Sequence, residues 1–118
     1  TIYGKFFGQS SMSSISIVNQ RSIISVAGLI KSKEEVALYT PLGCGIQASS
    51  GAIIRAAATS KDDRVAVIGL GGVGLSAIIA ARLQGCSIMI GIDPFDSRLD
   101  LAKQLGAAHV IDMPTWSR

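Results

Sequence analysis

The sequence is poor in the residues that mark several classes of protein. Aromatic residues make up 5% and charged residues 16% of the 118 residues, and the net charge of +3 includes no basic run. A nucleic-acid-binding surface combines clustered cations with aromatic side chains, so we expect no nucleic-acid partner. Two cysteines without C-x-x-C spacing are too few for a secreted disulfide scaffold. This cysteine usage favours a reducing compartment, and we expect the cytoplasm.

Targeting and membrane-spanning segments are also lacking in this sequence. The first residues, Thr1-Ile-Tyr-Gly-Lys5, do not combine a basic region with an apolar core, so we expect no signal peptide here. The most apolar stretch, Val65–Ala81, is slightly short for a membrane span, contains four glycines and has charged residues at both ends. A buried strand, turn and helix explain it better, and we expect no membrane partner. With 48% hydrophobic residues, the composition suits a globular α/β protein.

A strand-turn-helix pattern is the most informative feature that is present. The apolar run Val65–Ile68 predicts a buried parallel strand, and Gly69-Leu-Gly-Gly-Val-Gly74 follows it directly. Gly69 permits a tight turn, Gly71 lets the backbone approach a diphosphate, and Gly74 lets the next helix pack closely. That helix is indicated by the spacing of its apolar residues, which we expect to form one buried face: Leu75, Ile78, Ile79 and Leu83.

A ligand is indicated by the same pattern. The N–H groups near Gly72 and Val73, at the positive end of the helix dipole, are expected to face phosphates. Asp93 ends the next strand-like run, Ser87–Ile92, about twenty residues after the turn, where a carboxylate can bind an adenosine ribose. Its charge favours NAD over NADP, although Arg98 could lie beside the ribose or a phosphate. The alternative is that Asp93 is a turn residue before Pro94.

The remaining pattern divides the chain into unlike regions. Alternating apolar residues from Ser13 to Val26, around a turn at Asn19-Gln20-Arg21, predict two antiparallel strands. Helices are expected over Lys31–Tyr39, ended by Pro41, and from about Cys44 to Ala58. After the second strand, a helix over Arg98–Leu105 and a strand over His109–Ile111 complete one βαβαβ half of a doubly wound parallel (Rossmann) sheet. The predicted fold class is therefore α/β, preceded by a β-rich segment.

Several motifs together resemble those of the zinc-dependent medium-chain alcohol dehydrogenases. They are Pro41-Leu-Gly-Cys-Gly-Ile-Gln47, Val67-Ile-Gly-Leu-Gly-Gly-Val-Gly-Leu75, Asp93, and Leu105-Gly-Ala-Ala-His-Val-Ile111. The segment Phe6-Phe-Gly-Gln-Ser-Ser11 most resembles the aryl or benzyl alcohol dehydrogenase branch. The resemblance implies that residues 1–44 correspond to the end of a GroES-like catalytic domain and residues 45–118 to the first half of the NAD-binding domain.

The resemblance also implies a metal ligand. The cysteine of the Pro-Leu-Gly-Cys-Gly motif binds catalytic zinc in this family, and Cys44 has that position; its alternative is a buried free cysteine at a helix start. The other two ligands of the family come from upstream, and zinc needs about three protein ligands. Cys86 and His109 are expected to be a buried hydrophobe and a strand-end imidazole. Ala48 replaces a threonine that the family places against the nicotinamide.

The function that the resemblance implies is NAD-dependent hydride transfer between a primary or aryl alcohol and its aldehyde. We expect this chain to be a fragment that is inactive alone, with a homo-oligomer possible for the complete protein. One alternative is a non-catalytic remnant that binds a nucleotide or a partner, and another is a truncated product without a stable fold.

Overall fold

The computed structural model describes residues 14–26 and 28–113, which belong to two compact units with the boundary between Val36 and Ala37. The segment Phe6–Ser11, on which the resemblance to the aryl alcohol dehydrogenases depends, lies outside the described residues.

The described part of the first unit contains no extended β-strand. The predicted turn is present as the short helix η2 (Gln20–Ser22), where the Asn19 side chain accepts a hydrogen bond from the Arg21 N–H at 2.9 Å. The predicted strands on either side, and with them the β-rich remnant of a GroES-like domain, are wrong for residues 14–26. The side chain of Ile17 is 93% exposed, so there is no apolar face to stabilise a two-stranded pair, which is marginal alone.

Helices follow close to where the sequence predicts them. Helix α1 (Lys33–Tyr39) begins after Ser32, whose hydroxyl accepts the Glu35 N–H at 3.3 Å, as in a capping box. It ends at the 3-10 helix η3 (Thr40–Gly43), which contains the expected stop at Pro41. The helix predicted from about Cys44 to Ala58 is observed as α2 (Gly45–Gly51) followed by one π-helical turn, η4 (Ala52–Ala56).

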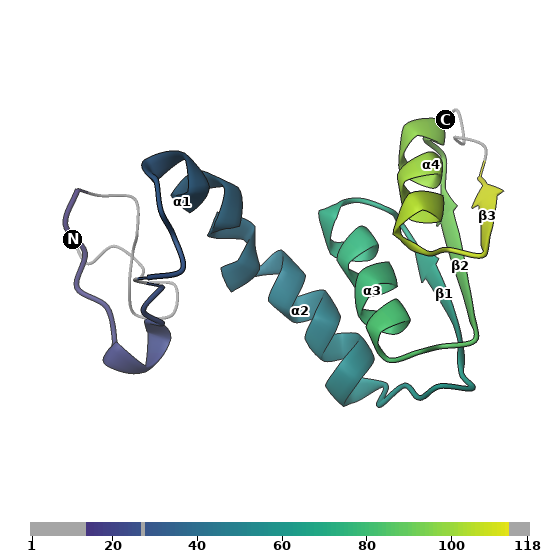
Figure 1. The fold of residues 1–118 in the computed structure, drawn as a ribbon, viewed down its shortest axis with the longest axis horizontal. Helices are drawn as coiled ribbons and strands as arrows, with labels where there is room; N and C mark the ends of the chain where they lie inside the picture. Colours follow the sequence, from purple (N-terminus) through teal and green to yellow (C-terminus); the bar gives the residue numbers. More distant parts are fainter. Residues whose placement is uncertain (1–13, 27, 114–118) are drawn as a thin grey trace, which may run out of the picture. The chain divides into compact units, whose positions relative to one another are not determined.

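The second unit contains the predicted alternation of strands and helices (Figure 1). The three strands pair in parallel in the order β1-β2-β3, with Ala66 opposite Ile90 and Gly91 opposite Val110. This arrangement confirms the Rossmann-like half sheet. In chain order the elements are β1 (Arg64–Ile68), α3 (Gly72–Leu83), β2 (Ile88–Asp93), α4 (Asp96–Leu105) and β3 (His109–Asp112).

The core lies between helices α3 and α4 and one face of the sheet. Met89, Gly91 and Asp93 of β2 alternate onto this face and are buried. A Cβ atom added to Gly91 would lie 3.0 Å from Leu70, so Leu70, the second residue of the glycine turn, packs into the core. The buried cluster consists of Leu70, Ile78, Ala81, Cys86, Met89, Leu99, Ala102 and Ala107.

The buried face of α3 differs from the one that the apolar spacing predicts. Ile78 is fully buried, but Ile79 and Leu83 are exposed, at 40% and 78%. Because α3 packs against both the sheet and α2, close approach depends on small side chains. The other buried residues of this helix are accordingly Gly74, Ser76, Ala77, Ala80 and Ala81.

Candidate functional site

The glycine turn joins β1 to α3: Gly69, Leu70 and Gly71 are not helical, and Gly72 begins α3. Gly69 has φ +87°, a conformation that glycine adopts without strain, and its N–H donates to the Ile92 carbonyl at 2.8 Å. A Cβ atom on Gly74 would overlap the Gly69 carbonyl oxygen. Gly69 and Gly74 thus have the turning and packing roles that the sequence predicts for them.

The other glycines of the turn leave space for a ligand. A Cβ atom added to Gly71 or Gly72 would have no other heavy atom within 4 Å, apart from its chain neighbours and the local helix backbone. Gly71 caps α3, and the first N–H groups of a helix have no partner within it. Gly72, Val73 and Gly74 therefore present N–H groups at the positive end of a 12-residue helix. This open cradle fits the diphosphate of a dinucleotide.

Asp93 lies at the same edge of the sheet as the turn and binds it directly. One carboxylate oxygen, Oδ2, accepts the Leu70 N–H at 2.7 Å, and Oδ1 accepts the Phe95 N–H at 3.0 Å. The second bond is the turn-forming contact expected if Asp93 is a turn residue before Pro94, so that alternative describes part of its role. The Leu70 contact was not predicted, because nothing in the sequence indicates which backbone N–H a carboxylate will meet.

Opposing effects act on the Asp93 carboxyl group. Burial alone raises its pKa, but the hydrogen bonds from Leu70 and Phe95 and the nearby Arg98 guanidinium together lower the pKa below its ordinary value. The carboxylate is therefore the form present in the folded protein at neutral pH.

This lowered pKa predicts a pH-dependent stability. A group whose pKa is lower in the folded state stabilises above its unfolded pKa, and we expect this contribution to disappear as pH falls below about 4. In Asp93→Asn, the free energy of unfolding should decline less steeply between about pH 5 and 3. Glu34 and Asp63 also have lowered pKa values and remain in both proteins, so the difference isolates Asp93. Parallel denaturant titrations would measure it, and equal slopes would contradict the expectation.

Arg98 completes this end of the site. Its Nη1 lies 3.4 Å from Asp93 Oδ2, and its guanidinium carbon lies 4.6 Å from the centre of the Phe95 ring. Phe95 was missed in the sequence analysis; its position three residues before Arg98, at the start of a helix, is the signal that could have indicated contact.

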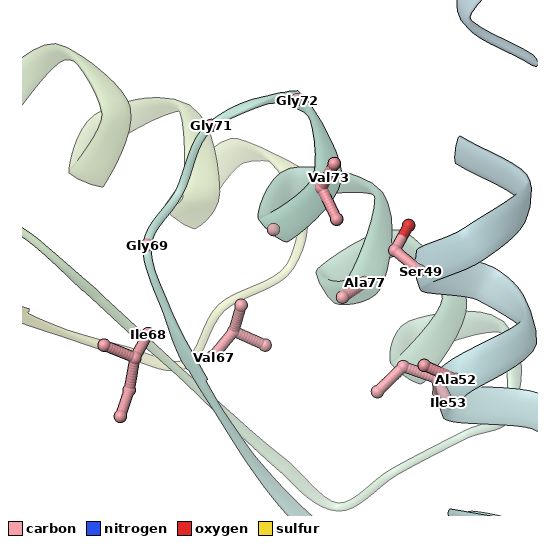
Figure 2. Close-up of a pocket in the computed structure, with 11 residues that line it drawn as sticks. Ser49, Ala52, Ile53, Val67, Ile68, Gly69, Gly71, Gly72, Val73 and Ala77 are labelled. Atoms are coloured by element: carbon pink, nitrogen blue, oxygen red, sulfur yellow. The ribbon is translucent and has the colours of Figure 1, made fainter. Parts of the chain in front are cut away.

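An apolar depression of about 460 Å³ lies beside the glycine turn (Figure 2). Its walls come from α2 and η4 on one side and from β1, the turn and α3 on the other. Ser49 is its one lining residue with a polar side chain, and its hydroxyl donates to the Ile46 carbonyl at 3.1 Å. The lining residues are Ser49, Ala52, Ile53, Val67, Ile68, Gly69, Gly71, Gly72, Val73, Gly74 and Ala77.

Cys44 is a free cysteine at the N-cap of α2, as the alternative to a zinc ligand predicts, but the burial that this alternative also predicts is wrong, because Cys44 is exposed. The next residue, Gly45, lies against α3, since a Cβ on it would be 3.2 Å from Val73. Among residues 14–26 and 28–113, no three His, Cys, Asp or Glu residues are grouped to hold a metal. Cys86 is buried in the core and His109 opens β3, as predicted. The described residues alone do not fit a catalytic zinc site, which needs about three protein ligands.

The glycine turn, the parallel order β1-β2-β3 and Asp93 together define one Rossmann-like βαβαβ half. Residues 72–117 match the family described as "Zinc-binding dehydrogenase". Over these residues the sequence and the fold match the zinc-binding medium-chain alcohol dehydrogenases. Members of the family use NAD(P) and zinc.

Similar proteins include both curated relatives and a solved structure. A probable alcohol dehydrogenase from Pseudomonas sp is 39% identical over 94% of this chain and 34% of its own length. Geraniol dehydrogenase from Castellaniella defragrans is 36% identical over 94% of this chain and 29% of its own. The crystal structure of benzyl alcohol dehydrogenase from Acinetobacter calcoaceticus is 49% identical, with a TM-score of 0.61, over 70% of this chain and 23% of that one.

The chain therefore spans about a third of the length of these curated relatives. None of the helices within the described residues has the length and apolar character needed to cross a membrane.

Proposed function

We propose that this chain binds the adenosine diphosphate half of NAD. The observation that carries the proposal is the 2.7 Å hydrogen bond from the Leu70 N–H to Asp93, because it couples the glycine turn to the carboxylate at the end of β2. A diphosphate-binding turn and a sugar-binding acid are useful together only when they lie at the same edge of a parallel sheet.

Each predicted site residue has a role in this proposal. Gly69 and Gly74 shape the turn, Gly71 lets the diphosphate approach the backbone, and the N–H groups of Gly72 and Val73 bind the diphosphate. A second group, Asp93 and Arg98, binds the sugar. When bound, NAD supplies a hydride acceptor, and the chain's own residues hold and orient its adenosine half.

The complete protein, we propose, is an NAD-dependent alcohol dehydrogenase that interconverts a primary or aryl alcohol and its aldehyde. Support comes from the family match and from relatives named as alcohol, geraniol and benzyl alcohol dehydrogenases. In this proposal residues 1–44 correspond to the end of the catalytic domain and residues 45–118 to the first half of the NAD-binding domain. Cys44 is one ligand of a zinc ion whose other ligands lie outside the described residues. In this proposal the complete protein is cytoplasmic.

Calorimetry with ADP-ribose tests the proposal on the full 118-residue chain. We expect saturable binding that Asp93→Ala weakens by about tenfold, because a charge-assisted hydrogen bond to the sugar is lost together with the support of Leu70. Asp96→Ala removes the same charge from the exposed first turn of α4 and should leave the affinity unchanged. Absence of saturable binding by the wild-type chain would refute the proposal.

A further inference from the structure

The apolar depression adjoins the position proposed for a diphosphate. Gly71, Gly72 and Val73 belong to both features, because they line the depression and lie where α3 begins. Figure 2 shows Val73 between the glycine turn and Ser49 of α2. A ligand whose diphosphate binds at the turn can therefore extend a further group into the depression.

The side chains of the depression offer a ligand almost no hydrogen-bonding groups. Ser49 is the one lining residue with a polar side chain, and its hydroxyl donates its proton to the Ile46 carbonyl at 3.1 Å. A hydroxyl carries one proton, so Ser49 can only accept a hydrogen bond from a ligand. Sugar hydroxyls or an amide buried against the other side chains would lose their bonds to water, which costs free energy. The lining therefore favours an alkyl group as the occupant.

Apolar side chains of the depression remain in contact with solvent. Ile68 is 74% exposed, and Ala52 and Val73 are exposed as well. The hydrophobic effect favours covering such surface with another apolar group. The volume of about 460 Å³ lies within the range of pockets that hold small ligands. A short alkyl chain thus matches the depression in both polarity and size.

The charges around the depression suit an anionic head group on such a chain. None of the described residues that line it is charged, and the N–H groups of Gly72 and Val73 lie at the positive end of α3. The side chain of Asp93, the acid that contacts the turn, is 1% exposed, and its Oδ2 accepts the Leu70 N–H at 2.7 Å. A diphosphate at the turn therefore meets N–H groups without facing an open carboxylate.

We infer that the glycine turn and the depression together bind alkyl diphosphates, the chemical class that includes prenyl diphosphates. The diphosphate lies at the N–H groups of Gly72 and Val73, and the alkyl chain lies in the depression. The inference rests on the diphosphate position of the proposed function and adds a class of ligand that has no adenosine. Because both ligands need the same N–H groups, an alkyl diphosphate and ADP-ribose exclude each other.

Calorimetry on the full chain with two alkyl diphosphates of equal charge tests the inference. We expect n-octyl diphosphate to bind at least about thirtyfold more tightly than methyl diphosphate, because only the longer chain buries apolar surface in the depression. ADP-ribose should displace n-octyl diphosphate in a competition titration. This comparison uses the wild-type chain and does not depend on the folding of a variant.

Ala52→Trp tests where the alkyl chain lies. Ala52 is exposed and lines the depression, so an indole there should fill the space and weaken n-octyl diphosphate by about tenfold while methyl diphosphate binds as before. Ala56→Trp is the matched control, since Ala56 is an exposed residue of the same turn, η4, and does not line the depression. Its affinities should equal those of the wild type, and circular dichroism would confirm that both variants fold.

The outcomes separate this inference from the proposed function. Equal affinities for the two alkyl diphosphates, no effect of Ala52→Trp, or no competition with ADP-ribose would overturn the inference while binding of ADP-ribose keeps the proposed function. NAD that binds far more tightly than ADP-ribose, without an alkyl preference, would assign the depression to the second half of the dinucleotide. Binding of n-octyl diphosphate without ADP-ribose would refute nucleotide binding alone, and failure of every diphosphate to bind would refute both.

Discussion

Replacing Gly74 with alanine is expected to destabilise the second unit by about 3 kcal/mol or more, a severe effect for one methyl group. The added Cβ would overlap the carbonyl oxygen of Gly69, which is backbone and cannot rotate away. Relief requires α3 to move from β1, and that movement would separate the small residues through which α3 reaches the core. Chemical denaturation followed by circular dichroism would measure the loss.

Gly72→Ala provides the control for this substitution. It adds the same methyl group two residues earlier in the same helix, at a position where a Cβ meets no heavy atom within 4 Å beyond its own helix and its chain neighbours. Alanine also favours helix more than glycine, so stability should stay the same or rise by up to about 1 kcal/mol. If both variants were destabilised equally, the contact between Gly74 and the Gly69 carbonyl would not be the reason for glycine at position 74.

Replacing Gly71 with alanine is expected to abolish most nucleotide binding and leave the fold intact. Gly71 has φ −70°, which alanine adopts freely, and its Cβ would project into the open cradle. A methyl group there keeps the diphosphate from the N–H groups of Gly72 and Val73. Loss of one or two hydrogen bonds to a charged group predicts an affinity about thirtyfold lower, measured with ADP-ribose by calorimetry.

Gly51→Ala is the matched variant, because Gly51 ends α2, outside the cradle, and a Cβ added there has no contact within 4 Å. Affinity should remain at the wild-type value in that variant, while both variants should unfold at similar denaturant concentrations. Tight binding by Gly71→Ala would mean that the diphosphate does not occupy the space beside Gly71.

The cofactor half of the fold could be predicted because its signals are local. Local sequence is enough to predict a buried strand from the apolar run Val65–Ile68, a tight turn from the glycines after it, and a strand end at Asp93. The parallel order of the strands follows from the helices that connect them. The prediction of strands up to Val26 was wrong, because apolar and polar residues can also alternate in a segment that does not pack against an apolar surface. Ile17 has the right spacing but lacks a buried face on which to pack.

The contacts of the predicted site residues were harder to predict from the sequence than the residues themselves. Arg98 was expected near a ribose or a phosphate, but its contact with the Phe95 ring and its cover over Asp93 depend on how α4 begins. Similarly, Gly45 lies close to Val73, which brings the start of α2 beside the glycine turn. These residues are 28 positions apart, and no periodic pattern in the sequence indicates their contact.

The order of glycines, strands and acid along the chain by itself determined the Rossmann-like half sheet and the resemblance to a dehydrogenase family. Turn conformation and strand burial follow from residue type and spacing. Only the tertiary structure decided that small residues, not Ile79 or Leu83, bury α3, and that a guanidinium covers the acid at the end of β2. The physical reason is that both outcomes depend on contacts between residues from different elements. Close packing and charge pairing are set by these contacts, and residue spacing along the chain does not specify them.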